Sequence, residues 1–159
     1  MKVIIALSFL LLFPVASYAG VFTRASHKTG VPLSILKSVA YVESGFKPFA
    51  LDIDGEPYFA KSYAHAYYIA RYFIDKGYSV DVGLMQVNYN IWAKRLGFSL
   101  RQLLMPQNNA AAGAYILGHY ILKRNNVLNG IGEYHSNNPA LAGVYEEKIL
   151  NAYKFFSTK

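Results

Sequence analysis

The sequence contains no cysteine among its 159 residues. This absence excludes disulfides, thiolate metal sites and a lipid-modified cysteine in the mature protein. Acidic residues are scarce as well, since 9 aspartates and glutamates stand against 16 lysines and arginines, a formal net charge of +7. The fold must therefore depend on packing alone, and its charge favours an anionic partner.

No apolar run in the chain reaches the roughly 20 residues that a membrane-spanning helix needs. The longest one, residues 3–13, follows Lys2 near the N-terminus, which is the pattern of a secretory signal rather than of a transmembrane anchor. We interpret residues 1–19 as a signal peptide that is cleaved after Ala19. Residues 20–159 then have the length of one domain with its own core.

The basic residues form no stripe and match no nucleic-acid-binding motif, so nucleic acid is not expected as a partner. An exported cationic protein would instead meet the acidic cell wall. The histidines lack the spacing of a metal site, and no cofactor is implied. The histidines are His27, His65, His119 and His135.

Helical periodicity dominates the chain after the signal peptide, whereas strand-like alternation is nearly absent. We therefore predict a mainly α fold of six to eight helices, with at most a small β-hairpin at Asp52–Gly55. Ser62 and Asn90 are expected to cap helices, and Ser99 forms a capping box with Gln102. Residues 125–138 are expected to be a glycine-punctuated connection. The predicted helices span about 32–43, 62–77, 90–96, 99–105, 109–124 and 139–156.

Glu43 does not fit a purely structural role. Leu36, Val39 and Ala40 precede it on one face of the first predicted helix, so its side chain lies on an apolar stripe. Burial and the negative C-terminal end of the helix dipole both raise a carboxyl pKa toward neutrality, which suits a general acid. The alternative is a helix-terminal glutamate whose carboxylate reaches past the core to solvent.

A second polar pattern follows in the segment Gly83–Asn88, which reads GLMQVN. Gln86 and Asn88 stand among apolar residues there, and their amides are costly to bury unless they form hydrogen bonds. A sugar acetamide or hydroxyl would satisfy them. A strand or turn whose polar groups pair within the protein explains the same pattern.

Four motifs occur in the order in which they are found in the lytic transglycosylases of the Slt type, and the chain resembles this family over roughly residues 25–153. The resemblance implies a single lysozyme-like domain of the goose type that cleaves bacterial peptidoglycan in the periplasm. The matching segments are Glu43-Ser44 for the catalytic "ES" motif, Gly83–Asn88 for "GLMQ(V/I)N", Ala111–Leu117 for the "GxxYL" helix and Tyr134–Ser136 for "AYN".

The resemblance also implies roles for individual residues. Glu43 would protonate the glycosidic oxygen between N-acetylmuramic acid and N-acetylglucosamine. It would then deprotonate the muramoyl C6 hydroxyl, whose oxygen closes a 1,6-anhydro ring without water. Ser44 would orient the carboxylate or the substrate acetamide. The substrate-binding residues implied in this way are Ser44, Met85, Gln86, Asn88, Tyr134 and Tyr145.

Ordinary glycosidases need two carboxylates, whereas the chemistry of this family needs one. The acids at positions 52–56 are expected in a turn, and those at 146–147 on a solvated helix face. Asp81 is the exception among the remaining acids, although its expected role is to cap or orient the turn before Gly83. This inventory favours cyclisation over hydrolysis.

Two departures from the common pattern resemble a small branch of the family that serves type IV secretion and conjugation. His135-Ser136 stand where an asparagine-containing sequence is more usual, and a long insertion precedes Gly83. Members of that branch open the wall locally so that a machine can be assembled through it. We therefore expect a monomer that acts on peptidoglycan, with proteins of such an apparatus as further partners. The alternatives are a hydrolytic muramidase and a non-catalytic wall-binding assembly factor.

Overall fold

A computed structural model describes residues 15–158 of the chain. Most of the expected signal peptide lies outside the described residues, and its last part continues into the first helix. The described residues form eight α-helices, one π-helical turn and a four-stranded antiparallel sheet. In chain order the elements are α1 (Val15–Thr29), α2 (Leu33–Ser44), β1 (Ala50–Ile53), β2 (Glu56–Phe59), α3 (Tyr63–Asp75), β3 (Val80–Val82), β4 (Val87–Asn88), the π-helical turn η1 (Tyr89–Ala93), α4 (Lys94–Leu96), α5 (Leu100–Leu103), α6 (Pro106–Arg124), α7 (Val127–His135) and α8 (Pro139–Phe156).

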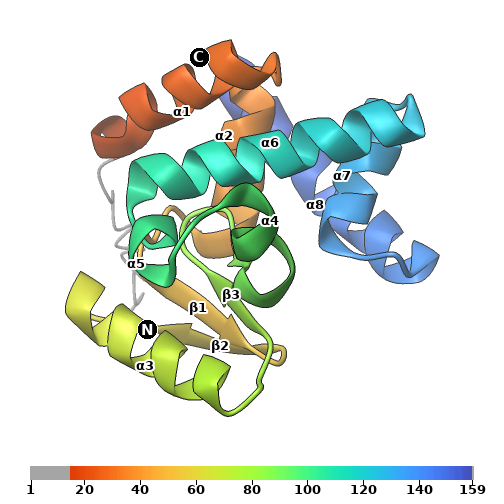
Figure 1. The fold of residues 1–159 in the computed structure, drawn as a ribbon. Helices are drawn as coiled ribbons and strands as arrows, with labels where there is room; N and C mark the ends of the chain where they lie inside the picture. The colour runs from red at the N-terminus through yellow and green to blue at the C-terminus, as the bar shows by residue number, and fades with distance from the viewer. Residues whose placement is uncertain (1–14, 159) are drawn as a thin grey trace, which may run out of the picture.

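Helix α6 lies across the middle of the molecule, with the sheet and α3 on one side of it and α1 on the other (Figure 1). It packs against α1 and α7, while α8 packs against both α2 and α7. Buried side chains from the helices and the sheet form one continuous core. The mainly α prediction is confirmed, and the core joins the end of α2 to the sheet. Its largest fully buried side chains include Phe22, Leu36, Leu51, Leu84, Met85 and Leu117.

The predicted hairpin is formed by β1 and β2. Asp54 and Gly55 occupy its two-residue turn, with φ of 52° and 92°, the left-handed conformations that an Asp-Gly hairpin turn requires. Two strands that the sequence did not predict extend the hairpin into a sheet of order β2-β1-β3-β4. Strands β3 and β4 contain three and two residues, so their alternation is too short to be visible in the sequence.

Most predicted helices are confirmed, and two of their starts are corrected. Asn88, not Asn90, caps the turn η1 by accepting a hydrogen bond from the backbone of Ile91 at 2.9 Å. The side chain of Asn90 instead accepts from the backbone N–H of Val80 at 3.2 Å. Helix α6 begins at Pro106 rather than near residue 109, because proline is well suited to the first helical turn.

The glycine-punctuated connection is wrong as a prediction, because these residues form α7. A Cβ atom at Gly130 would lie 2.5 Å from the Cα of Ile121 on α6, and one at Gly132 would overlap the carboxyl group of Glu146 on α8. The two glycines therefore let α7 approach its neighbours closely. Tertiary packing outweighs the low helix propensity of glycine here.

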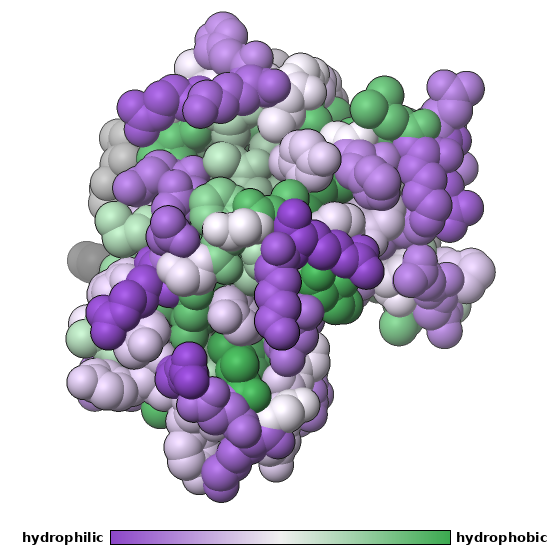
Figure 2. All heavy atoms as spheres, in the orientation of Figure 1, coloured by the Kyte–Doolittle hydropathy of each residue, from purple (hydrophilic) through white to green (hydrophobic). Residues whose placement is uncertain are grey.

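The surface of the molecule is mixed. Figure 2 shows hydrophilic residues spread over one face with apolar patches between them, rather than gathered in one band. None of the helices between Val15 and Thr158 is both long and apolar enough to cross a membrane.

Candidate active site

Glu43 is the penultimate residue of α2. Leu36, Val39 and Ala40, which share its face of the helix, are completely buried, so the predicted apolar stripe is confirmed. Gly45 ends the helix in the left-handed conformation, with φ of 59°. The side chain of Glu43 therefore extends from the side of α2 that faces the core, and the residue is only partly exposed.

The carboxyl group of Glu43 has a hydrogen-bond partner on the last helix. The hydroxyl of Tyr145, on α8, donates to Oε1 of Glu43 at 2.5 Å. Tyr145 is itself buried, with 3% of its surface exposed. Packing of α2 against α8 brings these two residues together although they are 102 positions apart. The carboxyl group is thus held by the protein instead of extending past the core into solvent.

This environment gives Glu43 an unusual acidity. Burial of the carboxyl group raises its pKa from 4.5 to about 7, and the negative charges of Asp81 and Asp52 act in the same direction. The hydrogen bond from Tyr145 and the positive charge of Lys148 oppose this rise. A carboxyl group with a pKa near 7 can give up and take back a proton at neutral pH, as a general acid and base must.

Asp81 is the second carboxylate of the site. It lies on β3 opposite Asp52 of β1 and accepts a hydrogen bond from the amide of Asn88 at 2.6 Å. Burial raises its pKa from 3.8 to about 6, the Asn88 bond opposes the rise, and the charge of Asp52 adds to it. Both pKa values are thus shifted toward neutrality, and Asp81 remains the more acidic of the two groups, as in the glycosidase pairs in which one carboxyl group is charged and the other is the acid. The expectation that the acids at 52–56 all lie in a turn is wrong, because Asp52 belongs to β1 and Glu56 to β2, and only Asp54 is in the turn.

The loop Gly83–Asn88 is built around Asn109, a buried residue of α6 that the sequence reasoning missed. Its Nδ2 donates to the carbonyl of Val82 at 2.7 Å and of Leu103 at 3.1 Å, and its Oδ1 accepts from the backbone of Met85 at 2.8 Å. Gly83 has φ of 81°, and a Cβ atom there would overlap the Asn109 amide. A polar residue near the start of an alanine-rich helix was the available signal.

The resemblance implies that Ser44 orients the carboxylate or the substrate acetamide, whereas the structure shows its hydroxyl paired with backbone carbonyls. The residue is buried, and its hydroxyl lies 2.8 Å from the carbonyl oxygen of Leu84 and 3.1 Å from that of Ala40. Its single proton can serve one acceptor fully, and the shorter contact is to Leu84. Ser44 thus ties the end of α2 to the loop that follows β3.

The side chains of this loop also turn inward. Met85 is completely buried and packs so closely on α6 that a Cβ atom at Gly113 would overlap its side chain. The amide of Asn88 is occupied by Asp81 and by Ser79. Gln86, at φ of 44°, donates from Nε2 to the carbonyl of Gly83 at 2.8 Å but keeps part of its surface exposed. Internal pairing, the alternative explanation of the pattern, accounts for the amide of Asn88 and for Nε2 of Gln86.

Tyr134 joins α7 to the same loop. Its hydroxyl donates to the carbonyl oxygen of Met85 at 2.6 Å. Burial, followed by the charges of Glu43 and Asp81, holds the pKa of Tyr134 well above its ordinary value, so the hydroxyl remains a donor. Tyr134 therefore lies close to the two carboxylates, although its hydroxyl is already used within the protein.

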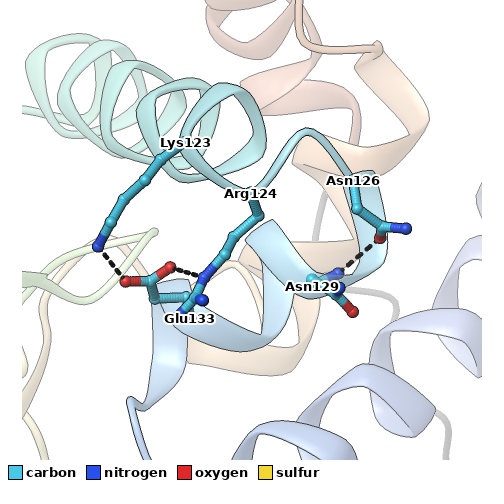
Figure 3. A network of polar contacts seen from close by, with 5 residues as sticks. All are labelled: Lys123, Arg124, Asn126, Asn129 and Glu133. Carbon is cyan, nitrogen blue, oxygen red and sulfur yellow. Dashed lines mark hydrogen bonds and ion pairs between the residues drawn. The ribbon is translucent and has the colours of Figure 1, made fainter.

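The neighbouring Glu133 fixes the orientation of α7 (Figure 3). One carboxylate oxygen accepts from Lys123 at 2.5 Å and the other from the Nε of Arg124, both at the end of α6. Burial would raise the pKa of Glu133, but these two bonds outweigh it and the net pKa is lowered. Glu133 is a buried acid with both oxygens paired to cations, so we assign it a structural role.

Two other kinds of site were considered, a metal site and the cavity beside α6. Within residues 15–158, no group of three or more His, Asp or Glu side chains is placed to hold a metal ion. A cavity of about 490 Å³ between α1, α6 and α7 is lined by Val31, Ile35, Tyr115 and Leu122 among others, and no carboxylate lines it. Glu43 at the end of α2, Asp81 on β3 and Asp52 on β1 lie close enough for their charges to interact.

Comparison with known proteins agrees with this geometry. The family model described as "Transglycosylase SLT domain" matches residues 20–153, most of the chain. The search of curated proteins and the search of solved structures found no match. The lysozyme-like helical fold and the peptidoglycan substrate both follow from the family match. The chain therefore belongs to the SLT transglycosylase domain family, the lytic transglycosylases that act on peptidoglycan.

Proposed function

We propose that Glu43 is the catalytic acid and base of a lytic transglycosylase that produces 1,6-anhydro-muramoyl ends. The observation that carries this proposal is the placement of its carboxyl group, which is removed from bulk water and held by the Tyr145 hydroxyl at 2.5 Å. A pKa of about 7 keeps much of the group protonated at neutral pH. It can therefore protonate a leaving group and afterwards accept a proton.

The reaction proceeds in two proton transfers. Protonated Glu43 donates to the oxygen between C1 of N-acetylmuramic acid and C4 of N-acetylglucosamine, and the C1–O bond breaks. The substrate's 2-acetamido group stabilises the positive charge at C1. Glu43, now a carboxylate, removes the proton of the C6 hydroxyl while that oxygen bonds to C1. No water is consumed, and Glu43 ends in its starting protonation state.

The predicted substrate-binding residues divide into two groups in this proposal. Gln86 keeps part of its surface exposed in the loop that follows β3 and remains the proposed direct contact. Ser44, Met85 and Asn88 shape the loop through buried contacts, so we propose that they act on substrate through the loop. Tyr134 and Tyr145 set the position of the loop and of the acid.

Asp81 supports a second candidate, a hydrolytic muramidase. Its raised pKa and its charge beside Glu43 give the site the two carboxylates that hydrolysis uses. Asp81 would then activate a water that attacks C1. In the lyase the same charge would stabilise the developing positive charge on the sugar.

The product of digestion decides between these reactions. Purified protein is incubated with peptidoglycan sacculi, and the released muropeptides are analysed by mass spectrometry. We expect anhydro-muropeptides from the wild type and from Glu56→Gln, a matched change at an exposed glutamate, and none from Glu43→Gln. Products heavier by one water at each cut would establish the muramidase. Wild-type protein that binds sacculi without releasing glycan would establish the non-catalytic assembly factor.

The setting is a further part of the proposal. We propose export through a signal peptide at residues 1–19, action in the periplasm, and local opening of the wall for a secretion or conjugation machine. The apolar run after Lys2 and the departure at His135-Ser136 support it, and the family match begins at Gly20. N-terminal sequencing of protein from the periplasmic fraction should begin at Gly20. Loss of machine assembly in a strain that carries Glu43→Gln would support the role in secretion, and normal assembly would contradict it.

A further inference from the structure

His135, the last residue of α7, lies flat against the tyrosine that holds Glu43. The imidazole and the ring of Tyr145 are stacked, with centroids 4.4 Å apart and planes 3° from parallel. Tyr145 is buried, whereas His135 is exposed. The imidazole therefore lies between the face of the Tyr145 ring and solvent.

Tyr145 connects the stacked imidazole to the carboxyl group of Glu43. The Tyr145 ring touches His135 through its face and Oε1 of Glu43 through its hydroxyl, at 2.5 Å. A hydroxyl moves with its ring, so a side chain that restrains the ring also restrains the hydrogen bond. Loss of the imidazole would give the Tyr145 side chain room to move and admit water to the bond.

The two residues that precede His135 are both anchored to other parts of the protein. Glu133 is tied to Lys123 and Arg124 of α6, and Tyr134 is bonded to the carbonyl of Met85. The imidazole therefore extends from the anchored end of α7 and not from a mobile loop. Although the residue is exposed, its imidazole is partly desolvated, and this desolvation, aided by the positive charge of Lys148, lowers the pKa of His135. The stacked ring is therefore neutral at neutral pH.

We propose that His135 is a positioning residue whose imidazole covers Tyr145 and keeps its hydroxyl on the carboxyl group of Glu43. The inference rests on the proposed function of Glu43 and deepens it. His135 does not transfer a proton in this role. The flat face of its ring is what matters, and a phenyl ring should replace it.

The test measures the acidity of Glu43 directly, without turnover. Protein labelled with 13C at the glutamate carboxyl groups is titrated by NMR, and the Glu43 signal is assigned by its loss in Glu43→Gln. Tyr145→Phe removes the donor and should raise the pKa of Glu43 by about one unit, because the hydrogen bond stabilises the charged form of the carboxyl group. His135→Ala should raise it in the same direction by a smaller amount. His135→Phe should retain the wild-type value.

The pH profile of glycan release gives the second readout. We expect His135→Ala to shift the profile upward in pH and to lower kcat several-fold at pH 7 with little change in KM, and His135→Phe to restore both. His27→Ala, a change at an exposed histidine of α1, serves as the matched control and should behave as the wild type. Thermal unfolding of each variant identifies any change that comes from loss of the fold.

Each outcome separates this inference from the function on which it depends. An unchanged Glu43 pKa in folded His135→Ala overturns the positioning role, whatever the activity. Loss of activity in His135→Phe equal to that in His135→Ala would show that a ring nitrogen acts directly, which also overturns it. A wild type that titrates as expected but releases no glycan contradicts the proposed function and leaves the stack intact.

Discussion

Replacement of Glu43 by glutamine should remove activity and stabilise the protein at neutral pH. The folded-state pKa of Glu43 is about 7, against an unfolded value of 4.5. Because the folded pKa is raised, its contribution to stability is fully present below pH 4.5 and is lost as the pH rises through 7. The difference corresponds to at most about 3 kcal/mol at 1.36 kcal/mol per unit. Part of the residue is exposed, so we expect a loss on the order of 2 kcal/mol.

Glutamine cannot ionise, and its amide oxygen can still accept the bond from Tyr145. The free energy of unfolding of Glu43→Gln, relative to that of the wild type, should therefore increase by about 2 kcal/mol between pH 4 and pH 8 and be constant above pH 8. Asp81 titrates in both proteins, so its contribution largely cancels. Urea unfolding at pH 4, 5.5, 7 and 8.5 measures the difference, and Glu56→Gln should show none. A difference that does not change with pH would refute the claim that Glu43 is desolvated.

Three further predictions concern the surroundings of Glu43. Asp81→Asn removes a negative charge, so the pKa of Glu43 should fall and the alkaline limit of the rate profile should move to lower pH; an unshifted profile would contradict the coupling. Asn109→Ala should destabilise the protein by about 2 to 4 kcal/mol in urea unfolding, because buried backbone groups lose their partners, whereas the exposed neighbour Gln107→Ala should not. Gly113→Ala should lower the free energy of unfolding by about 1 to 3 kcal/mol, because the added methyl group overlaps Met85. Gly143→Ala in α8, where a Cβ atom meets nothing within 4 Å, should be neutral or stabilise the helix. Equal effects of the two changes would exclude close packing as the cause.

Local spacing predicted most of the helices and the apolar face that carries Glu43, whereas the catalytic role of Glu43 came from the family resemblance. The period that places Leu36, Val39 and Ala40 on one face also places Glu43 there, and the structure confirms that these three neighbours are buried. Desolvation at this position raises the pKa of the Glu43 carboxyl group. The partner of that carboxyl group lies 102 residues away. Helical period carries no information about which distant helix packs against α2, so Tyr145 could be identified only as a matching motif position.

Helix α7 shows where local propensity fails. Its glycines favour a loop when the segment is considered alone. In the folded chain they admit the backbone of Ile121 and the side chain of Glu146, and this close packing makes the helix possible. The same reasoning applies to β3 and β4, whose few residues gain order from pairing with β1 and with each other.

The polar residues in and around the Glu43-Ser44 and Gly83–Asn88 motifs differ in whether the protein itself satisfies their polar groups. This difference distinguishes residues that act in the reaction from residues that maintain the structure. Ser44, Asn88 and Asn109 have their polar groups occupied by the protein, so replacing them leaves donors or acceptors unpaired and should cost both activity and stability. Glu43 is the opposite case, because its charge is unfavourable where it lies and its replacement by glutamine should cost activity while adding stability. Inactive variants of this protein can therefore be sorted by their unfolding free energy at pH 8. Only a group retained for its reactivity should combine lost activity with a gain in that energy.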